Sequence, residues 1–599
     1  MKYPRSAMFT ALVALFVLAG FVAAAPRTVD PGRALKGLDV FIQKMLAEWK
    51  VPGAAVAIVT KDSVILARGY GWRDVEAKLP ATADTLFAIG SCSKAFTTTG
   101  LAILADEDKL DWDAPVRSYL PSFKLYDPVV SERMIVRDLV SHRSGLPRHD
   151  MVWYSSKFSR QELFDRLQYL EPSRDLRQLY QYNNLMFMAA GCLLEKLAGQ
   201  AWEEFIRQRI LEPLGMSQTN FSVEEMSQAK DFARPYAEFK GQVVPIPFHN
   251  LAGIGPAGSI NSSAADMALW LQLNLNKGKS GEKPIVSEPE LTRLQSPQMV
   301  ISQPLRYDEL FYGAYGLGWN INSYRGHLLV SHSGSIDGFE ARVALLPREG
   351  FGLIVLANLS HNPLPAIISY QLCDRLLGLA PADWNGRLTQ ERARAREKVE
   401  AAKAEEEKAC QPGSQPSHRL EEYAGFFVHP GYGTIVIERD GQRLKGRLNE
   451  IPFLLAHYHY DIFRALNEPL DFGYLISFRT GLKGDIESLA VKLEPAVEAI
   501  IFNRAPSDKL KQKDFADKLA GSYTFSGIVG KVVLRANTLF FIIPGKPEYE
   551  LEPYQGLEFK MKNIGGFTIE FVLDPSDKDR VVELISRQPD GVFRFGRKD

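Results

Sequence analysis

The chain has 599 residues, of which 46% are hydrophobic and 24% are charged. This globular composition argues against extensive disorder and against a polytopic membrane protein, and the length predicts about two to four domains. Lys plus Arg and Asp plus Glu each number 71, so no net field recruits nucleic acid or anionic lipid. We therefore expect a small-molecule or peptide partner.

Residues 1–25 are typical of a signal peptide. Lys2 and Arg5 form a basic start, residues 8–22 are apolar, and residues 23–25 are small and suited to cleavage. An uncleaved N-terminal anchor is the alternative, because the apolar run is only slightly shorter than a membrane span. Since no later segment looks membrane-spanning, we expect an exported protein, periplasmic or secreted, with no span in its mature part.

Residues 30–382 predict an α+β domain. Apolar and polar residues alternate over residues 51–71 around Lys61-Asp62, the pattern of a hairpin with one buried face. Helical spacing covers residues 95–104, 184–197 and 264–275, whereas residues 328–333, 340–346 and 352–358 predict strands. Strands at both ends of a helical insertion indicate one mixed sheet closed by distant segments of the chain.

Residues 383–418 separate this domain from a different kind of sequence. The segment is rich in Arg, Lys, Glu and Ala, which predicts a solvated helix, and it runs into a Pro/Gly/Ser linker. Beyond it, short strands with turn residues such as Asp440-Gly441 predict hairpins. A similar opening occurs at residues 423–427 and 519–523, so we expect two antiparallel β-barrels, 419–504 and 517–599. One divided barrel is the alternative.

Ser91 and Lys94 are the first candidates for chemistry. They follow a strand-like run and precede an apolar helix, so Ser91 would lie at a helix N-terminus with Lys94 one turn on, on the same face. A Lys whose charge is disfavoured can take the proton of a serine hydroxyl. Ser227 and Ser280 also begin Ser-x-x-Lys patterns, but both lie in polar segments. Position therefore favours Ser91.

Two further motifs support this choice. Tyr182-Asn-Asn184 is the only Tyr-x-Asn in the chain and stands just before an apolar helix, where the phenol can relay a proton and Asn184 can orient Lys94 and a substrate amide. An N-cap Asn beside a core Tyr is the competing interpretation. His332-Ser333-Gly334 stands at the end of the strand-like LLVS, where the N–H of Ser335 can serve as an oxyanion donor and Gly334 permits close approach of a substrate.

The order and spacing of Ser-x-x-Lys, Tyr-x-Asn and His-Ser-Gly resemble the three-motif set of the penicillin-binding, class C β-lactamase-like serine hydrolases. Flanking segments such as FAIGSCSKAFTT, RDLVSHRSGLPRHD and PAGSINSSAADMALWL look like family segments across residues 35–380. The resemblance implies a β-lactamase/transpeptidase-like mixed α/β sandwich, with an antiparallel sheet and a helical domain. The carboxy-terminal, lipocalin-like barrels resemble those appended to some D-aminopeptidases and related serine peptidases.

The resemblance also implies roles for particular residues. Ser91 would be the nucleophile, Lys94 with Tyr182 the general base, and the N–H groups of Ser91 and Ser335 the oxyanion donors. His332 departs from the Lys of the common Lys-Thr-Gly motif, so a permanent cation for a substrate carboxylate is missing there. Esterases and peptidases of the family often have His at this position.

The expected function is therefore hydrolysis through a Ser91 acyl-enzyme, with a peptide, including one that contains D-residues, or an ester as substrate. A β-lactamase or D,D-carboxypeptidase is the second interpretation, and a non-catalytic binding or scaffold protein with this fold is a third. We predict neither a metal nor another cofactor. Self-association into a homo-oligomer stays open.

Overall fold

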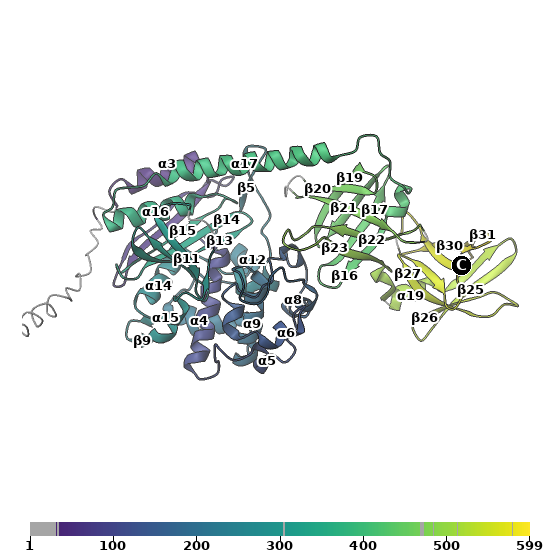
Figure 1. Ribbon diagram of the computed structural model, residues 1–599, viewed down its shortest axis with the longest axis horizontal. Helices are drawn as coiled ribbons and strands as arrows, with labels where there is room; N and C mark the ends of the chain where they lie inside the picture. Colours follow the sequence, from purple (N-terminus) through teal and green to yellow (C-terminus); the bar gives the residue numbers. More distant parts are fainter. Residues whose placement is uncertain are drawn as a thin grey trace, which may run out of the picture.

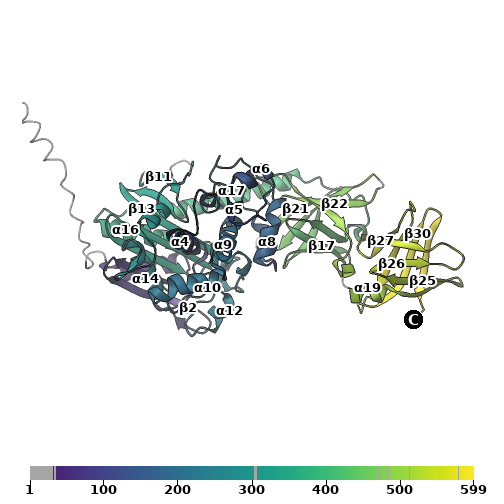
Figure 2. The same ribbon diagram turned by 90° about the horizontal axis from the view of Figure 1, so that it is seen from below.

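The computed structural model describes residues 32, 35–302, 306–467, 472–482, 484–511, 513–577 and 579–598. The predicted signal peptide, residues 1–25, lies outside this part of the chain. In Figures 1 and 2 an α/β body is followed by two β-barrels. Among the described residues, no helix combines the length and the apolar character needed to cross a membrane.

The α/β body is built on a nine-stranded sheet with the order β10-β11-β12-β13-β14-β15-β1-β2-β3. The strand pairings described within it are antiparallel, as the family resemblance implied, so the expectation of a mixed sheet was wrong. The reason is that successive strands are joined as hairpins and β1 adds to β15 without a parallel crossover. The strands are β1 (Gly53–Thr60), β2 (Val64–Asp74), β3 (Leu79–Pro80), β10 (Met299–Val300), β11 (Leu310–Tyr315), β12 (Asn320–Tyr324), β13 (His327–Ile336), β14 (Phe339–Leu346) and β15 (Phe351–Ala357).

The predicted hairpin of residues 51–71 is formed by β1 and β2. β1 is buried on both faces, however, and not on one. Ala55, Ala57 and Val59 pack into the core on the side of the large helical region, while the alternating residues pack against α3 (Leu38–Glu48) and α16 (Leu364–Leu377). A strand covered by helices on both faces accounts for its nearly continuous apolar sequence.

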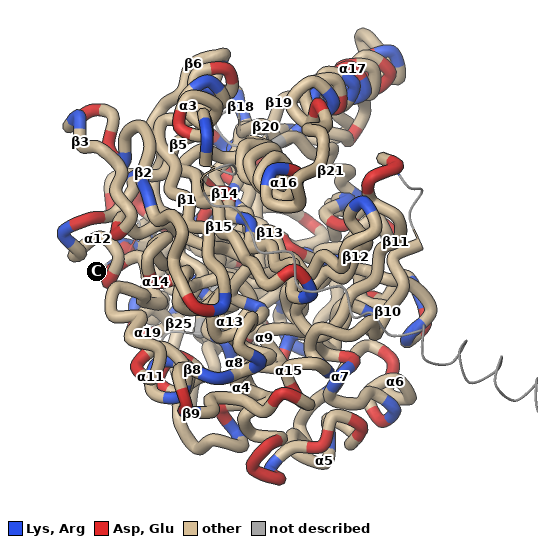
Figure 3. Tube along the Cα trace, turned by 90° about the vertical axis from the view of Figure 1, so that its left-hand side faces the viewer, with Lys and Arg blue, Asp and Glu red and all other residues tan. Residues whose placement is uncertain are grey.

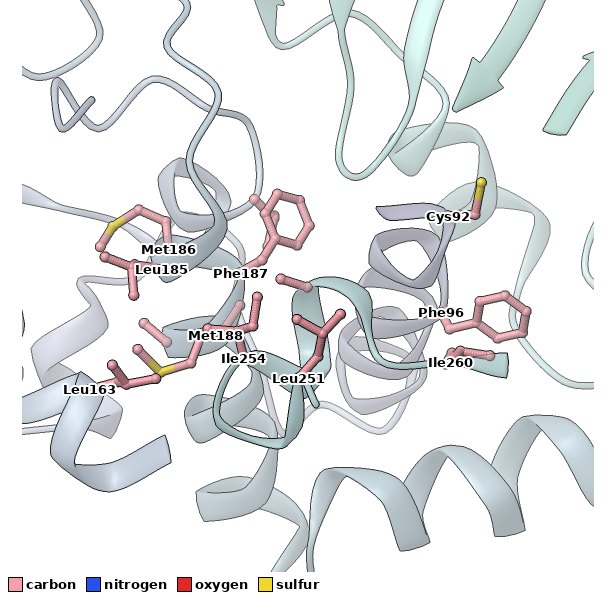
Figure 4. Packing of buried hydrophobic residues seen from close by; sticks show 14 of the residues in the cluster. Cys92, Phe96, Leu163, Leu185, Met186, Phe187, Met188, Leu251, Ile254 and Ile260 are labelled. Atoms are coloured by element: carbon pink, nitrogen blue, oxygen red, sulfur yellow. The ribbon is translucent and has the colours of Figure 1, made fainter. Parts of the chain in front are cut away.

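The three predicted helices are α4 (Ser93–Asp106), α9 (Asn184–Ala198) and α14 (Ala264–Leu275). Figure 4 shows buried residues of this region, with Cys92 and Phe96 at the start of α4 and Met186, Phe187 and Met188 along α9. The remaining helices of this body are α5 (Val116–Tyr119), α6 (Pro128–Arg133), α7 (Val136–Leu139), α8 (Arg160–Arg166), α10 (Trp202–Ile206), α11 (Glu212–Leu214), α12 (Val223–Gln228), α13 (Gly255–Gly258) and α15 (Glu288–Leu294).

In the described part of the chain, three small two-stranded sheets lie outside the main sheet. They are β4 (Phe87–Ala88) with β7 (Asn261–Ser262), β5 (Tyr236–Phe239) with β6 (Gln242–Pro245), and β8 (Lys279–Ser280) with β9 (Lys283–Pro284). The β4–β7 pair has the most consequence for the site, because it joins the chain just before Ser91 to the segment that follows α13.

Helix α17 (Trp384–Ala409) is the predicted charged helix. Its first residue, Trp384, is buried against the α/β body, while most of its length is exposed and carries both signs of charge (Figure 3). Near its other end, Glu406 and Glu407 form ion pairs with Arg464 of the first barrel. The helix therefore connects the α/β body to that barrel along one side of the molecule (Figure 1).

Two closed eight-stranded antiparallel barrels follow, which decides against one divided barrel. Each begins after a short helix, α18 (Leu420–Tyr423) or α19 (Lys513–Leu519). Barrel 1 contains β16 (Gly425–His429), β17 (Gly433–Asp440), β18 (Arg443–Leu448), β19 (Ile451–His459), β20 (Ile462–Asn467), β21 (Phe472–Thr480), β22 (Ile486–Val491) and β23 (Ile500–Ala505). Barrel 2 contains β24 (Gly521–Phe525), β25 (Ile528–Arg535), β26 (Thr538–Ile542), β27 (Tyr549–Gln555), β28 (Glu558–Met561), β29 (Thr568–Leu573), β30 (Val581–Gln588) and β31 (Gly591–Arg597).

Candidate active site

Ser91 lies in a single 3-10 turn, Gly90–Cys92, that leads directly into α4. Lys94 follows one turn later on the same face, and its Nζ lies 3.0 Å from Ser91 Oγ. Lys94 is fully buried, although Ser91 itself is partly exposed. A buried amine in hydrogen-bond contact with a reachable hydroxyl is the arrangement that serine activation requires.

Two more acceptors surround Lys94 Nζ, namely Asn184 Oδ1 and the backbone oxygen of Ala257, each at 2.8 Å. A neutral amine can donate its two hydrogens to these oxygens and direct its lone pair at the Ser91 hydroxyl. Burial holds the pKa of Lys94 well below its usual value, and the nearby charge of Arg148 lowers it further. The site therefore favours Lys94 in the form that can accept the serine proton.

The three residues of the segment Tyr182-Asn183-Asn184 have different partners. Asn183 caps α9, since its side chain accepts from the N–H of Met186 at 2.8 Å, and this leaves Asn184 for Lys94. Tyr182 lies with its ring centroid 4.9 Å from Lys94 Nζ, and the Ser91 side chain is close enough to lower the pKa of its phenol slightly. Burial raises the pKa of Tyr182, so the phenol stays protonated at neutral pH and can donate a proton.

Strand β13 lies against the start of α4, and two glycines permit this approach. A Cβ on Gly334 would lie 1.8 Å from the backbone oxygen of Ile89, and one on Gly90 would lie 2.8 Å from the nitrogen of Ser335. β12 pairs with β13 only as far as Ser331, so beyond that residue this edge of β13 faces the turn that holds Ser91. The backbone nitrogens of Ser91 and Ser335 thus lie on two segments that pack against each other, as the two donors of an oxyanion hole would.

The side chains of Ser333 and Ser335 are directed to other partners. Arg342 donates to Ser333 Oγ at 3.0 Å, and Ser335 Oγ donates to Glu340 at 2.7 Å. The backbone N–H of Ser335 is therefore the group that could serve as an oxyanion donor.

His332 is buried beneath the site. One ring nitrogen, Nδ1, lies 2.7 Å from the backbone oxygen of Ser333, and the other, Nε2, lies 2.8 Å from the hydroxyl of Tyr315. Nδ1–H must then donate to the carbonyl while Nε2 accepts from the tyrosine. Burial lowers the pKa of His332 to about 3, so it is neutral and supplies no cation near pH 7.

A hollow and a larger cleft adjoin the end of β13. The hollow is lined in part by Ala88, Ser259 and Ile336, and its wall of residues 248–251 also borders a cleft of about 490 Å³. That cleft extends to Glu450 on barrel 1. Neither lining includes Ser91, Lys94 or Tyr182.

Two parts of the chain match known protein families. A family described as beta-lactamase matches residues 38–372, more than half of the chain. The chain belongs to the beta-lactamase family. A second match, described as a domain of unknown function (DUF3471), covers residues 409–504 and so includes barrel 1.

Similar proteins of this family include hydrolases. Unguisins hydrolase ungD' of Aspergillus campestris is 30% identical over 440 residues, which cover 70% of this chain and 80% of that protein. Protein flp of Staphylococcus aureus is 26% identical over 337 residues, 56% of this chain and 65% of that protein. With its beta-lactamase fold and these relatives, the protein is a serine hydrolase.

The fold is also that of a solved structure, the octameric penicillin-binding protein homologue from Pyrococcus abyssi. The two share 23% identity and a TM-score of 0.52, over 85% of this chain and 98% of that one. At this identity the likeness concerns the fold alone, including the part that follows the beta-lactamase domain.

Sequence reasoning missed several groups that contact the predicted residues, three of them around Lys94, Tyr182 and Asn184. Arg148 lies with its guanidinium 5.2 Å from the Tyr182 ring, Asp150 accepts from Asn184 Nδ2 at 3.3 Å, and the backbone oxygen of Ala257 accepts from Lys94. Arg148 and Asp150 belong to the polar run RDLVSHRSGLPRHD, which was noted only as a family segment. A backbone carbonyl leaves no signal in the sequence.

Proposed function

We propose that this serine hydrolase cleaves an ester or a peptide, including peptides with D-residues, through an acyl-enzyme on Ser91. The observation that carries the proposal is the hydrogen bonding of Lys94, whose two acceptors, Asn184 Oδ1 and Ala257 O, leave the lone pair of a neutral amine for Ser91. Ser91 Oγ attacks the substrate carbonyl as its proton moves to Lys94 Nζ. The N–H groups of Ser91 and Ser335 stabilise the oxyanion.

Collapse of the tetrahedral intermediate needs a proton for the leaving group. In this proposal Tyr182 passes it; support comes from burial, which keeps the phenol protonated, and from the 4.9 Å distance between its ring centroid and Lys94 Nζ. The proton that Lys94 took from Ser91 then replaces the one that Tyr182 gives. Water repeats the sequence on the acyl-enzyme and restores Ser91, with Lys94 again acting as the base.

The charge of the site favours a neutral ester or amide over a carboxylate-bearing β-lactam. A neutral His332 stands where the related motif has a permanent cation. This lowers the expected affinity for the carboxylate of a β-lactam or of a D-Ala-D-Ala peptide.

The test is intact-protein mass after brief exposure to an activated ester, for wild type and Ser91→Ala side by side. We expect an acyl adduct in wild type that is absent from the variant. Turnover of a short-chain ester, a D-Ala-D-Ala peptide and a cephalosporin then separates the substrate classes. Full hydrolysis by Ser91→Ala would refute the proposal, and a folded wild type without an adduct would favour a binding protein.

Export and self-association are part of the same proposal. Export is supported by the basic start at Lys2 and Arg5, the apolar run and the small residues at 23–25. Self-association is supported by the similar protein from Pyrococcus abyssi, which is octameric. The N-terminal residue of protein recovered from the periplasm or medium tests the first, and light scattering of the purified protein tests the second.

A further inference from the structure

The segment 148–155 lies between barrel 1 and the candidate catalytic residues. On the catalytic side, Arg148 faces the Tyr182 ring at 5.2 Å and Asp150 Oδ1 accepts from Asn184 Nδ2 at 3.3 Å. Arg148 Nε and Asp150 Oδ2 also pair at 2.6 Å. The segment therefore brings a cation and a carboxylate to residues that contact Lys94.

On its other side, the same segment is held by barrel 1 through His149. Glu494 Oε2 accepts from the backbone N–H of His149 at 2.9 Å, and the Tyr432 hydroxyl lies 2.7 Å from its Nδ1. Its Nε2 lies 2.9 Å from the backbone oxygen of Glu171, which can only accept. Nε2 therefore carries the proton, and Nδ1 accepts from the hydroxyl of Tyr432.

The conformation of His149 requires such support. This residue is fully buried and has φ 47° and ψ 37°, in the left-handed region that a non-glycine residue rarely adopts. A conformation of this kind costs about 1–3 kcal/mol and persists where surrounding contacts hold it. Here two of the contacts come from barrel 1, 283 and 345 residues further along the chain.

Barrel 1 also holds the far end of the segment. Asn449 Nδ2 lies within hydrogen-bond distance of the backbone oxygens of Met151, at 3.0 Å, and Tyr154, at 3.1 Å. The backbone N–H of Glu450 donates to the backbone oxygen of Ser155 at 3.0 Å. The barrel thus contacts the backbone of the segment on both sides of Asp150.

We infer that barrel 1 is a positioning domain for the active site, in which Tyr432 and Glu494 hold His149 so that Arg148 and Asp150 are fixed against Tyr182 and Asn184. The inference rests on the proposed function for its catalytic consequence, although the contacts themselves do not. The inference assigns a role to the domain of unknown function that includes barrel 1. The α/β body supplies the reacting groups, and barrel 1 fixes Arg148 and Asp150 beside them.

The positions of Arg148 and Asp150 affect the pKa of Lys94. Burial lowers the pKa of Lys94 most, and Arg148 lowers it further by more than Asp150 raises it. The other titratable groups near Lys94 stay neutral at working pH, because burial lowers the pKa of His142 and His332 and raises that of the Tyr182 phenol and of the Cys92 thiol, the last to about 12. Loosening the segment should therefore raise the pKa of Lys94 and move the acidic limb of the rate profile to higher pH.

The experiment compares Tyr432→Phe with Tyr423→Phe in the full chain. Tyr423 is a matched control, because it is also buried in barrel 1 and its hydroxyl contacts Asp461 instead of His149. We measure kcat/KM for an ester against pH, together with hydrogen exchange of residues 148–155. Tyr432→Phe should lower kcat/KM about fivefold, the equivalent of one neutral hydrogen bond, shift the acidic limb upward and speed exchange. The control should do none of these.

Two further variants separate positioning from folding. Glu494→Gln keeps an acceptor for the His149 N–H, so the acidic limb of its kcat/KM profile should stay at the wild-type pH. Glu494→Leu removes this acceptor and should shift the acidic limb to higher pH, as Tyr432→Phe does. Arg148→Ala should shift the limb by itself, and adding Tyr432→Phe to it should add no further shift.

The outcomes are distinct. An acidic limb unchanged in Tyr432→Phe, or exchange in 148–155 no faster than in the control, would overturn the inference. If wild type forms no acyl adduct, the proposed function fails, and the exchange comparison still decides whether the barrel holds the segment.

Discussion

The contact between β13 and the turn that carries Ser91 allows a sharp test with Gly334→Ala. The added Cβ would lie 1.8 Å from the backbone oxygen of Ile89, whereas ordinary contact begins at 3.4 Å. The strand and the turn must therefore separate by about 1.6 Å, which moves the N–H of Ser335 away from that of Ser91. A 1 Å misplacement can cost about 10²-fold, and loss of one oxyanion donor costs about 10²–10³-fold.

The assay is kcat/KM on a short-chain ester, with melting temperature measured on the same samples. Gly258→Ala is the control, because its added Cβ would lie 3.6 Å from Leu251 and 3.7 Å from Gly90, in ordinary contact. We expect Gly334→Ala to lose at least 10²-fold and the control to stay within about threefold. A folded Gly334→Ala protein that keeps a tenth or more of the wild-type rate would refute the reasoning.

Three further outcomes follow from the buried titratable groups. Lys94→Met removes the base and should lower the acylation rate about 10³-fold, measured by the growth of the acyl adduct in single-turnover mass spectrometry; a loss below tenfold would contradict its role. His332 has a folded pKa of about 3, below its unfolded value of 6.5, so the unfolded state binds more protons between these values and stability falls as pH drops below 6.5. His332→Gln should reduce the loss of unfolding free energy between pH 7 and pH 5 by about 2 kcal/mol, measured by denaturant titration, and equal losses in both proteins would contradict this. Burial raises the pKa of Glu340 to about 7 from 4.5, so the folded state binds the extra proton and stability falls as pH rises through this window. Relative to wild type, Glu340→Gln should gain up to about 3 kcal/mol more at pH 8 than at pH 5, and a pH-independent difference would contradict the assignment.

The sequence predicted the parts of this protein that depend on local spacing. Helical periodicity located α4, α9 and α14, and a strand–turn–helix context distinguished Ser91 from Ser227 and Ser280. One helical turn places Lys94 beside Ser91 whatever surrounds them, which is why the sequence could predict that these two side chains lie together. The burial of β1 on both faces was missed, because it depends on a helix from the far end of the domain.

The rest of the site depends on tertiary contacts that leave no periodic signal. Ala257 O reaches Lys94 through α13, where Pro256 packs so closely on Gly191 that a Cβ there would lie 2.1 Å from the proline ring. The charge state of His332 could not be predicted either, because the sequence shows that an imidazole is present but not how far it is buried from water. The sequence indicated only that a permanent cation is missing at this position, whereas burial leaves the ring fully neutral near pH 7.

The tertiary contacts and the charge of His332, neither of which the sequence could predict, both bear on which residue carries the positive charge next to Lys94. In the proposed mechanism Lys94 acts as a neutral amine. A positive charge near it lowers its pKa and so supports that role, as long as the charged group does not replace Lys94 in the hydrogen bond with Ser91. His332 is neutral, whereas Arg148 is charged and lies on the face of Tyr182. Because Arg148 precedes His149, which barrel 1 contacts, the charge next to the reacting groups depends on a domain that contributes none of them. Substrate charge preference in this protein should therefore respond to changes in barrel 1 as well as to changes in the catalytic motifs.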